Sequence, residues 1–175
     1  MLARVAREFV YEHAKEFGGS EFGEFVRHDI AIEAKKRLIY LPYDLTTKAS
    51  VGAGKWAAVP WLGFFDPLVT TSATKGYYVV YLINPQTEEI FLSLNQGTTA
   101  VYNEFGEIRG RDVLRRRAND IHERVSEYAN RFNHEPIDLG SAERLPAGYE
   151  AGHAFGTRYH ADRIDQETFD RDFEY

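Results

Sequence analysis

Apolar side chains recur at helical spacing through the first 41 residues, and two glycines divide this stretch into two segments. The repeating positions are Val5 and Phe9 before the glycines, then Phe22, Phe25, Val26, Ile30, Leu38 and Tyr40 after them. Gly18 and Gly19 interrupt the pattern, Ser20 is a favoured N-cap residue, and Pro42 disfavours a helical residue before it. We therefore expect two amphipathic helices whose apolar faces pack on a core.

The middle of the chain has the composition of strands and turns, because it is rich in Thr, Val, Tyr, Phe and Trp and is punctuated by Gly and Pro. The clearest strand pair is residues 77–83 and 89–95, joined by turn-forming residues at 84–87. This pattern predicts a β-hairpin. A strand before Gly52 and a segment at residues 61–65 would complete a curved sheet of roughly three to five strands.

After Gly106 the apolar positions return to steps of four and three over a long stretch. These positions are Leu114, Ala118, Ile121, Val125, Tyr128 and Phe132, and the residues mainly off this stripe include Arg115, Arg116, Arg117 and Arg124. The spacing predicts one long helix that docks its apolar stripe on the sheet and leaves its arginines free to reach water or phosphate. Asn133, Pro136 and Gly140 are expected to break the helix.

The remaining segments complete an α+β reading of the chain. Residues 148–159 are expected to form a further extended stretch, and residues 165–175 the beginning of an acidic helix. No repeat, low-complexity tract or linker divides the sequence, so we expect one domain over residues 1–175, with a curved, mainly antiparallel sheet packed against N-terminal helices and one long central helix. Because the last helix stops early at Tyr175, we expect a fragment of a longer protein.

The composition narrows the functional classes. With 43% hydrophobic and 14% aromatic residues, the chain can bury a sizeable core. Its lack of cysteine excludes disulfides, thiolate metal sites and a cysteine nucleophile, and no apolar run is long enough for a signal peptide or a membrane span. We therefore expect a soluble, cytoplasmic protein with no membrane partner.

The net charge of −6, taken alone, argues against a nucleic-acid partner, because Lys and Arg supply most non-specific affinity for phosphates. The charges are unevenly distributed, however. Acidic residues crowd positions 162–174, whereas basic residues cluster at positions 35–37 and 109–124. One face of the molecule could therefore be basic, and the alternative is that these clusters are ordinary solvated helix faces.

Motifs for catalysis are missing from the sequence. Residues 52–55 read Gly-Ala-Gly-Lys, but a Walker A loop needs a glycine and a Ser or Thr where this chain has Ala49 and Trp56. The six histidines follow no metal-ligand spacing, and no nucleophile elbow or nuclease signature is found. We therefore expect a recognition domain rather than an enzyme, with no catalytic residue, metal or cofactor.

Three aromatic and glycine-rich segments occur in a distinctive order. Residues 50–61 read SVGAGKWAAVPW, residues 75–82 read KGYYVVYL, and residues 92–99 read LSLNQGTT. This order is similar to that of the N-terminal DNA-binding domain family of McrB-type modification-dependent (type IV) restriction enzymes. The resemblance is dense over residues 46–99, looser at residues 148–153, and limited to the helical pattern in the N-terminal segment.

The resemblance implies a domain that grips double-stranded DNA carrying a methylated or related modified cytosine and flips that base into an aromatic pocket. It implies pocket walls at Trp61, Leu82 and Tyr149, and it implies an aromatic residue where this chain has Ala53. Three alternatives follow from this departure: Trp56 takes over the stacking, the pocket accepts a bulkier modification, or base capture is altered. A tryptophan that follows a proline in a sheet protein is also often only a core residue.

Lysines and arginines are the expected contacts to the DNA backbone, because phosphate contacts position a protein without reading sequence. The candidates are Lys55, Lys75, Arg115, Arg116 and Arg117. The resemblance further implies a downstream AAA-type GTPase or nuclease, as a domain or a subunit, that acts on the DNA. The alternative is a non-enzymatic binding module of the same fold that recognises RNA or a protein partner.

Overall fold

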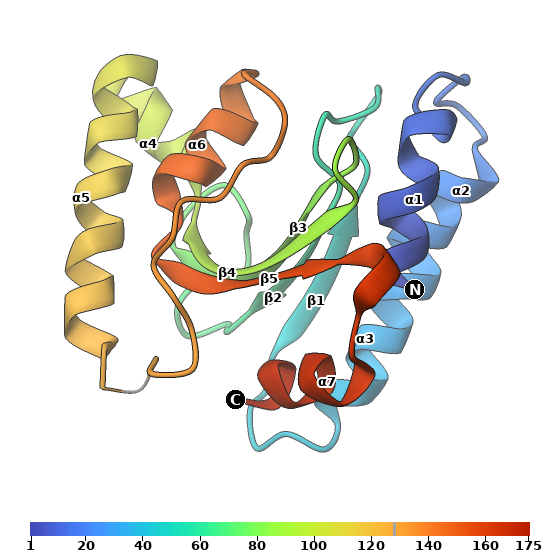
Figure 1. Cartoon of the computed structure of the whole chain (residues 1–175). Helices are drawn as coiled ribbons and strands as arrows, with labels where there is room; N and C mark the ends of the chain where they lie inside the picture. Colours follow the sequence, from blue (N-terminus) through green and yellow to red (C-terminus); the bar gives the residue numbers. More distant parts are fainter. Residues whose placement is uncertain (128) are drawn as a thin grey trace.

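A five-stranded antiparallel sheet forms the centre of the computed structural model, which describes residues 1–127 and 129–175. The strands pair in chain order and are β1 (Thr46–Ser50), β2 (Trp61–Phe65), β3 (Tyr77–Asn84), β4 (Glu89–Gln96) and β5 (Phe155–His160) (Figure 1). The predicted hairpin, the strand before Gly52 and the segment at residues 61–65 are confirmed. The curved sheet and its helices confirm the expected α+β fold class.

Alternation along the strands gives the sheet two separate apolar faces. Leu62, Tyr81 and Ile90 belong to the cluster on the first face, which includes residues of the N-terminal helices. Trp61 and Leu82 belong to the cluster on the second face. Because both faces are covered, β3 and β4 are buried along most of their length and read as nearly continuous apolar runs.

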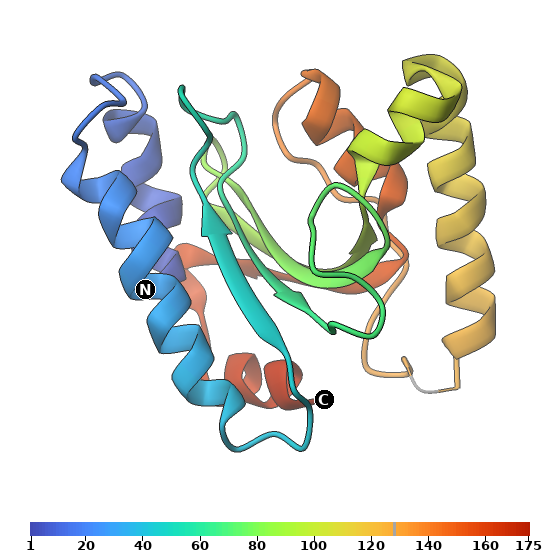
Figure 2. The same ribbon diagram turned by 180° about the vertical axis from the view of Figure 1, so that it is seen from behind.

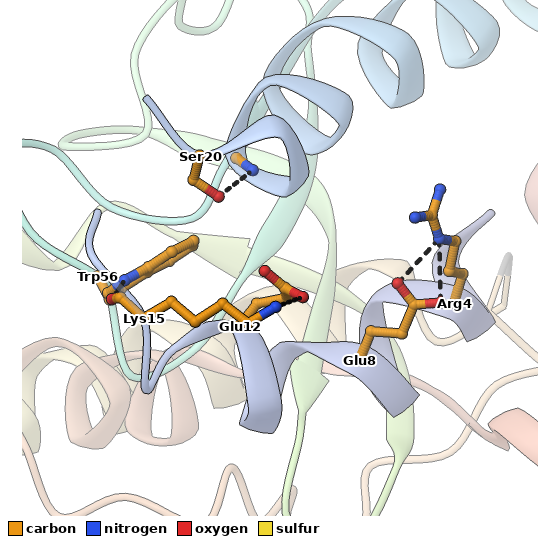
Figure 3. Close-up of polar contacts among 7 residues, drawn as sticks. Arg4, Glu8, Glu12, Lys15, Ser20 and Trp56 are labelled. Carbon is orange, nitrogen blue, oxygen red and sulfur yellow. Dashed lines mark hydrogen bonds and ion pairs between the residues drawn. The ribbon is translucent and has the colours of Figure 1, made fainter. Parts of the chain in front are cut away.

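The N-terminal helices cover the first face, with α3 lying along β1 (Figure 2). They are α1 (Leu2–Glu12), α2 (Glu21–Glu24), a π-helical segment (Phe25–Ile30) and α3 (Ala31–Leu38). The Ser20 hydroxyl accepts a hydrogen bond from the backbone N–H of Gly23 at 3.1 Å, which confirms the predicted N-cap (Figure 3). The second helical run ends at Leu38, a few residues before Pro42, as expected.

The predicted long helix is confirmed as α5 (Glu107–Val125), but it reaches the sheet mainly through other helices. Its buried residues face α4 (Thr98–Phe105) and α6 (Arg144–Gly152), and α6 lies between α5 and the sheet (Figure 1). A direct link to the sheet comes from Gln96, whose Nε2 donates to the Leu114 carbonyl at 2.9 Å. The expectation that the whole stripe docks on the sheet is therefore corrected.

The end of the long helix also differs from the prediction. The helix stops at Val125, so Phe132 lies outside it, and Tyr128 lies outside the described residues. Phe132 instead stacks with Phe155 of β5, at a ring-centroid distance of 6.2 Å. The adjacent Asn133 forms an isolated antiparallel bridge with Gly156. Because of this pairing, the chain returns to the sheet at Asn133, and the helix ends before the last apolar positions of the predicted stripe.

The segment at residues 148–159 is only partly extended, because its first half belongs to α6 and only its second half forms β5. Gly148 and Gly152 lie in the helix, where they allow it to approach its neighbours closely. A Cβ on Gly148 would lie 2.1 Å from Cγ2 of Thr98, and one on Gly152 would lie 2.8 Å from Oδ1 of Asn95. These glycines mark close packing, which the composition alone did not distinguish from an extended segment.

The chain closes with α7 (Gln166–Glu174), which lies across the first face beside α3 (Figure 1). The Asp165 carboxylate accepts a hydrogen bond from the backbone N–H of Thr168 at 3.2 Å and caps the helix. The expected acidic helix at the end of the chain is confirmed. Its aromatic residues Phe169 and Phe173 face Tyr81 on the sheet.

Candidate nucleic-acid interface

Trp61, Leu82 and Tyr149 belong to the same cluster on the second face of the sheet. Trp61 is the first residue of β2 and is the cross-strand partner of Leu82 in β3, while Tyr149 comes from α6. Leu82 is 1% exposed, whereas Trp61 and Tyr149 are half-buried. The structure therefore places three of the expected pocket residues on one face of the sheet, with Trp61 and Leu82 adjacent and Tyr149 anchored nearer Asn95.

Aromatic residues pack firmly within the same cluster. The rings of Phe65 and Tyr78 lie 5.0 Å apart, and the Tyr78 hydroxyl donates to the Ala73 carbonyl at 3.1 Å. Burial raises the pKa of Tyr149 to about 12, so its hydroxyl stays neutral near pH 7 and can both donate and accept a hydrogen bond. The cluster is thus a closely packed aromatic surface in which the Tyr149 hydroxyl can form hydrogen bonds.

The segment between α5 and α6 closes this cluster with Ile137 and Leu139. The Glu150 carboxylate on α6 accepts a hydrogen bond from the backbone N–H of Leu139 at 2.8 Å. The Asn84 side chain at the end of β3 donates to the Asp138 carbonyl at 3.0 Å. The segment is therefore anchored from both the helix and the sheet.

A buried polar network fixes α6 on β4. Ser93 Oγ lies 2.7 Å from His153 Nδ1, and the Asn95 amide donates to Ser93 Oγ at 3.1 Å and to the Tyr149 carbonyl at 3.0 Å. Desolvation, with a smaller effect of nearby His134, lowers the pKa of His153 to about 4, so this imidazole is neutral near pH 7. Because Asn95 holds the backbone of Tyr149, the network sets the position of that ring over the sheet.

Sequence reasoning did not single out Ser93, Asn95 or His153 as a group. The signal that could have found the first two is their spacing, because polar residues at alternate positions of an apolar strand share one face and need partners when buried. This alternate spacing does not identify His153, because its contact with Ser93 forms only when α6 docks on the sheet.

The loop between β1 and β2 projects next to Trp61, because Ser50 and Trp61 are paired where the loop begins and ends. Gly52 adopts a φ of 121°, and a Cβ there would lie 2.0 Å from the Lys55 carbonyl oxygen, so this turn requires glycine. The backbone N–H of Ala57 donates to the Val51 carbonyl at 2.7 Å and closes the turn. Ala53 and Lys55 are therefore exposed at a tightly held tip.

Trp56 belongs to the opposite cluster, on the first face of the sheet. Its indole packs edge-on against Phe9 and Phe17, with ring centroids 5.8 and 5.1 Å away, and its Nε1–H donates to the Lys15 carbonyl at 2.9 Å (Figure 3). The expectation that Trp56 joins the Trp61 cluster is thus corrected. The glycine turn between β1 and β2 breaks the strand alternation, so sequence spacing did not determine which face Trp56 joins.

The two expected phosphate-contacting lysines lie at opposite ends of the sheet. Lys55 is at the tip of the β1–β2 loop, whereas Lys75 precedes β3 in a segment that lies beside the start of α4. In that segment the Thr74 carbonyl accepts a hydrogen bond from the backbone N–H of Ala100 at 2.9 Å. Because β3 has eight residues, the two ends are separated by roughly 25 Å. The two lysines therefore do not form one local basic patch.

The expected arginines lie on the exposed side of α5. Arg115 forms an ion pair with Asp112 at 2.9 Å, which offsets part of its charge. Among the residues that the structure describes, no acidic side chain lies within ion-pairing distance of Arg116 or Arg117. These two guanidinium groups are free to contact an anionic partner.

Metal sites and membrane-spanning helices are both absent from the part of the chain that the structure describes. Within residues 1–127 and 129–175, no group of three or more His, Cys, Asp or Glu side chains is arranged to hold a metal ion. None of the helices in that part of the chain combines the length and apolar character needed to traverse a lipid bilayer.

Comparison with known protein families identifies the family of this chain. A family model described as MrcB-like, N-terminal domain matches residues 4–174, which include every strand and helix named above except the first residues of α1. No curated protein matches the chain. The chain therefore belongs to the McrB-like N-terminal domain family, whose members are DNA-binding rather than catalytic modules of type IV restriction systems.

Proposed function

We propose that this DNA-binding module recognises modified cytosine by extruding the base from the duplex and holding it against Trp61 and Tyr149. The observation that carries the proposal is that Trp61, Leu82 and Tyr149 share one face of the sheet, with Trp61 beside an exposed glycine loop. The half-buried rings supply stacking surfaces, and the buried Leu82 supplies an aliphatic wall. The alternative of an RNA or protein ligand has no comparable feature in its support.

The physical reason for extruding the base is the weakness of a single methyl group as a signal. In the major groove a methyl group offers one small apolar contact, whereas an enclosed base contacts pocket walls on several sides. Extrusion costs a few kcal/mol, and stacking on an aromatic side chain returns about 1–3 kcal/mol per base. The two free energies nearly cancel, so a modification that fits the pocket shifts the equilibrium from the stacked toward the extruded base.

Ala53 leaves the loop side of this site without a stacking surface. Trp56 does not replace it, because its indole would first have to leave Phe9, Phe17 and the Lys15 carbonyl. We therefore favour the alternative of a wider site that accepts a modification bulkier than a methyl group.

The backbone contacts in this proposal come from two places. Lys55 lies at the loop tip near the extruded nucleotide, and Arg116 and Arg117 offer free guanidinium groups on α5. Lys75 and Arg115 are secondary candidates, because the first lies at the far end of the sheet and the second is paired with Asp112. A GTPase motor or nuclease, in another domain or subunit, would then act on the bound DNA.

Binding of the Trp61→Ala variant to duplexes with unmodified, methylated and hydroxymethylated cytosine tests the proposal. Loss of one stacking surface is expected to reduce the preference for a modified duplex by about 5- to 150-fold. Trp56→Ala is the matched control, because it removes a half-buried indole from the opposite face and should keep the preference while the protein is folded. An unchanged preference in folded Trp61→Ala would refute the pocket.

A second arm of the same assay separates positioning from recognition. Replacing both Arg116 and Arg117 with alanine is expected to weaken binding to every duplex alike and to flatten its salt dependence. Single-stranded RNA serves as the competing ligand. A tighter complex with RNA than with any duplex would favour the alternative function.

A further inference from the structure

The loop between β2 and β3 exposes a run of apolar residues at its tip. They are Pro67, Leu68 and Val69, and Leu68 is 95% exposed, the highest value for a large apolar side chain in the part of the chain that the structure describes. Single exposed apolar residues are common on protein surfaces, but a consecutive run of them is unfavourable unless it has a function. The tip therefore needs a partner that covers it.

Hydrogen bonds hold this tip in one conformation. The Asp66 carboxylate accepts a hydrogen bond from the backbone N–H of Leu68 at 2.8 Å, and the Asp66 carbonyl accepts those of Val69 and Thr70 at 2.9 and 2.8 Å. Below the tip, the buried Thr70 hydroxyl donates to the Lys75 carbonyl at 2.9 Å. Leu68 is therefore presented on a fixed turn, so little conformational entropy is lost when a partner covers it.

The loop lies on the same face of the sheet as the candidate base site. Its Ala73 packs against the cluster that contains Trp61 and Tyr149. The Thr74 carbonyl accepts a hydrogen bond from the backbone N–H of Ala100, so the loop stands beside α4 (Figure 2). A duplex bound at this face therefore lies next to the loop as well.

The charge of the loop is compatible with DNA, although the chain as a whole is acidic. Residues 66–76 contain one acidic residue, Asp66, and one basic residue, Lys75, in a chain with a net charge of −6. The Asp66 carboxylate is engaged at the tip, whereas Lys75 and the hydroxyl-bearing Thr71 are exposed. Ammonium and hydroxyl groups contact phosphate oxygens, so the loop combines an apolar tip with groups that can hold the DNA backbone.

We propose that Leu68 inserts into a base step of the bound duplex from the minor groove and kinks the DNA. Leucine is among the side chains that proteins use as such wedges, with kinks of about 20–90°. This inference rests on the proposed function and extends it, because a step that is already unstacked lowers the free energy needed to extrude a base. Lys75 contacts the phosphates beside the inserted side chain.

Fluorescence energy transfer between dyes at the two ends of an unmodified duplex tests this role. A free duplex of about 25 base pairs is nearly straight, because its length is far below the persistence length of DNA. The parent protein should shorten the end-to-end distance at saturation. Leu68→Ala should abolish this bend and weaken binding by about 10- to 50-fold, through the loss of most of the inserted side chain. Leu68→Met keeps an apolar side chain of similar volume and should bend the duplex as the parent does.

Ile39→Ala is the matched control. Ile39 is 76% exposed and follows α3, which covers the opposite face of the sheet, so its replacement should leave both the bend and the affinity unchanged. Leu68→Ala should unfold at the same temperature as the parent, because so exposed a side chain has no buried contact to lose. A structural role of Leu68 would instead lower that temperature.

The outcomes separate this inference from the proposed function. A bend that the parent produces and Leu68→Ala does not supports the wedge, whatever Trp61→Ala does to the preference for modified duplexes. A straight duplex in the parent complex, or a bend of equal extent with Leu68→Ala, would overturn the wedge without touching the base pocket. A lower unfolding temperature of Leu68→Ala would also overturn it.

Discussion

Replacing Gly148 with alanine probes the close contact that positions Tyr149. The added Cβ would lie 2.1 Å from Cγ2, 2.6 Å from Oγ1 and 2.9 Å from Cβ of Thr98, whereas ordinary contact begins at 3.4 Å. Rotation of the Thr98 side chain cannot relieve the contact with its own Cβ. The N-terminal part of α4 and α6 must therefore move apart.

The expected destabilisation follows from these distances. Overpacking costs about 1–3 kcal/mol, and the higher helix propensity of alanine returns up to about 1 kcal/mol. A net loss of about 2 kcal/mol corresponds to a decrease of about 4–8 °C in the unfolding temperature for a chain of this size. Displacement of α6 should also shift Tyr149 within the cluster on the second face and reduce the preference for modified duplexes.

Thermal unfolding followed by circular dichroism, combined with the duplex-binding assay, measures both effects. Gly18→Ala is the matched control, because its nearest contact would be the Glu16 carboxylate at 3.9 Å, and we expect no loss of stability. Adding Thr98→Ala to Gly148→Ala should restore part of the stability by removing the two closest atoms. Equal unfolding temperatures for Gly148→Ala and Gly18→Ala would show that α6 does not approach α4 this closely.

Two further predictions concern the loop and the buried histidine. Ala53→Tyr should strengthen binding to modified duplexes by about fivefold or more, because the added ring can stack on the base. Ala53→Leu is the control and should not strengthen binding. Unchanged binding of Ala53→Tyr would show that the loop tip does not reach the base. The pKa of His153 is about 4 in the folded state against 6.5 in the unfolded chain, so the unfolded state binds more protons between these pH values. About 3 kcal/mol of stability that is present above pH 6.5 should therefore be lost as the pH falls to 4. Urea unfolding at pH 7, 5.5 and 4 measures this loss, and an equal pH dependence in His153→Gln would assign it to other groups.

Local patterns determined much of the secondary structure. The apolar spacing of α1, the Ser20 cap and the hairpin of β3 and β4 are all readable, because their signals come from residues close in sequence. Helix α5 was found for the same reason, but its end was not, because the pairing of Asn133 with Gly156 depends on a distant strand. Gly148 was misread because glycine is frequent both in extended segments and where two helices pack closely.

The candidate site draws on both the sequence and the tertiary structure. The order of residues 46–99 was sufficient to indicate the family, which the family model confirms. The resemblance also implied Trp61, Leu82 and Tyr149 as pocket walls, and that assignment stays a prediction. That Trp56 faces the N-terminal helices while Trp61 faces α6 was decided only by the tertiary structure, because a glycine turn between paired strands has no fixed side-chain periodicity.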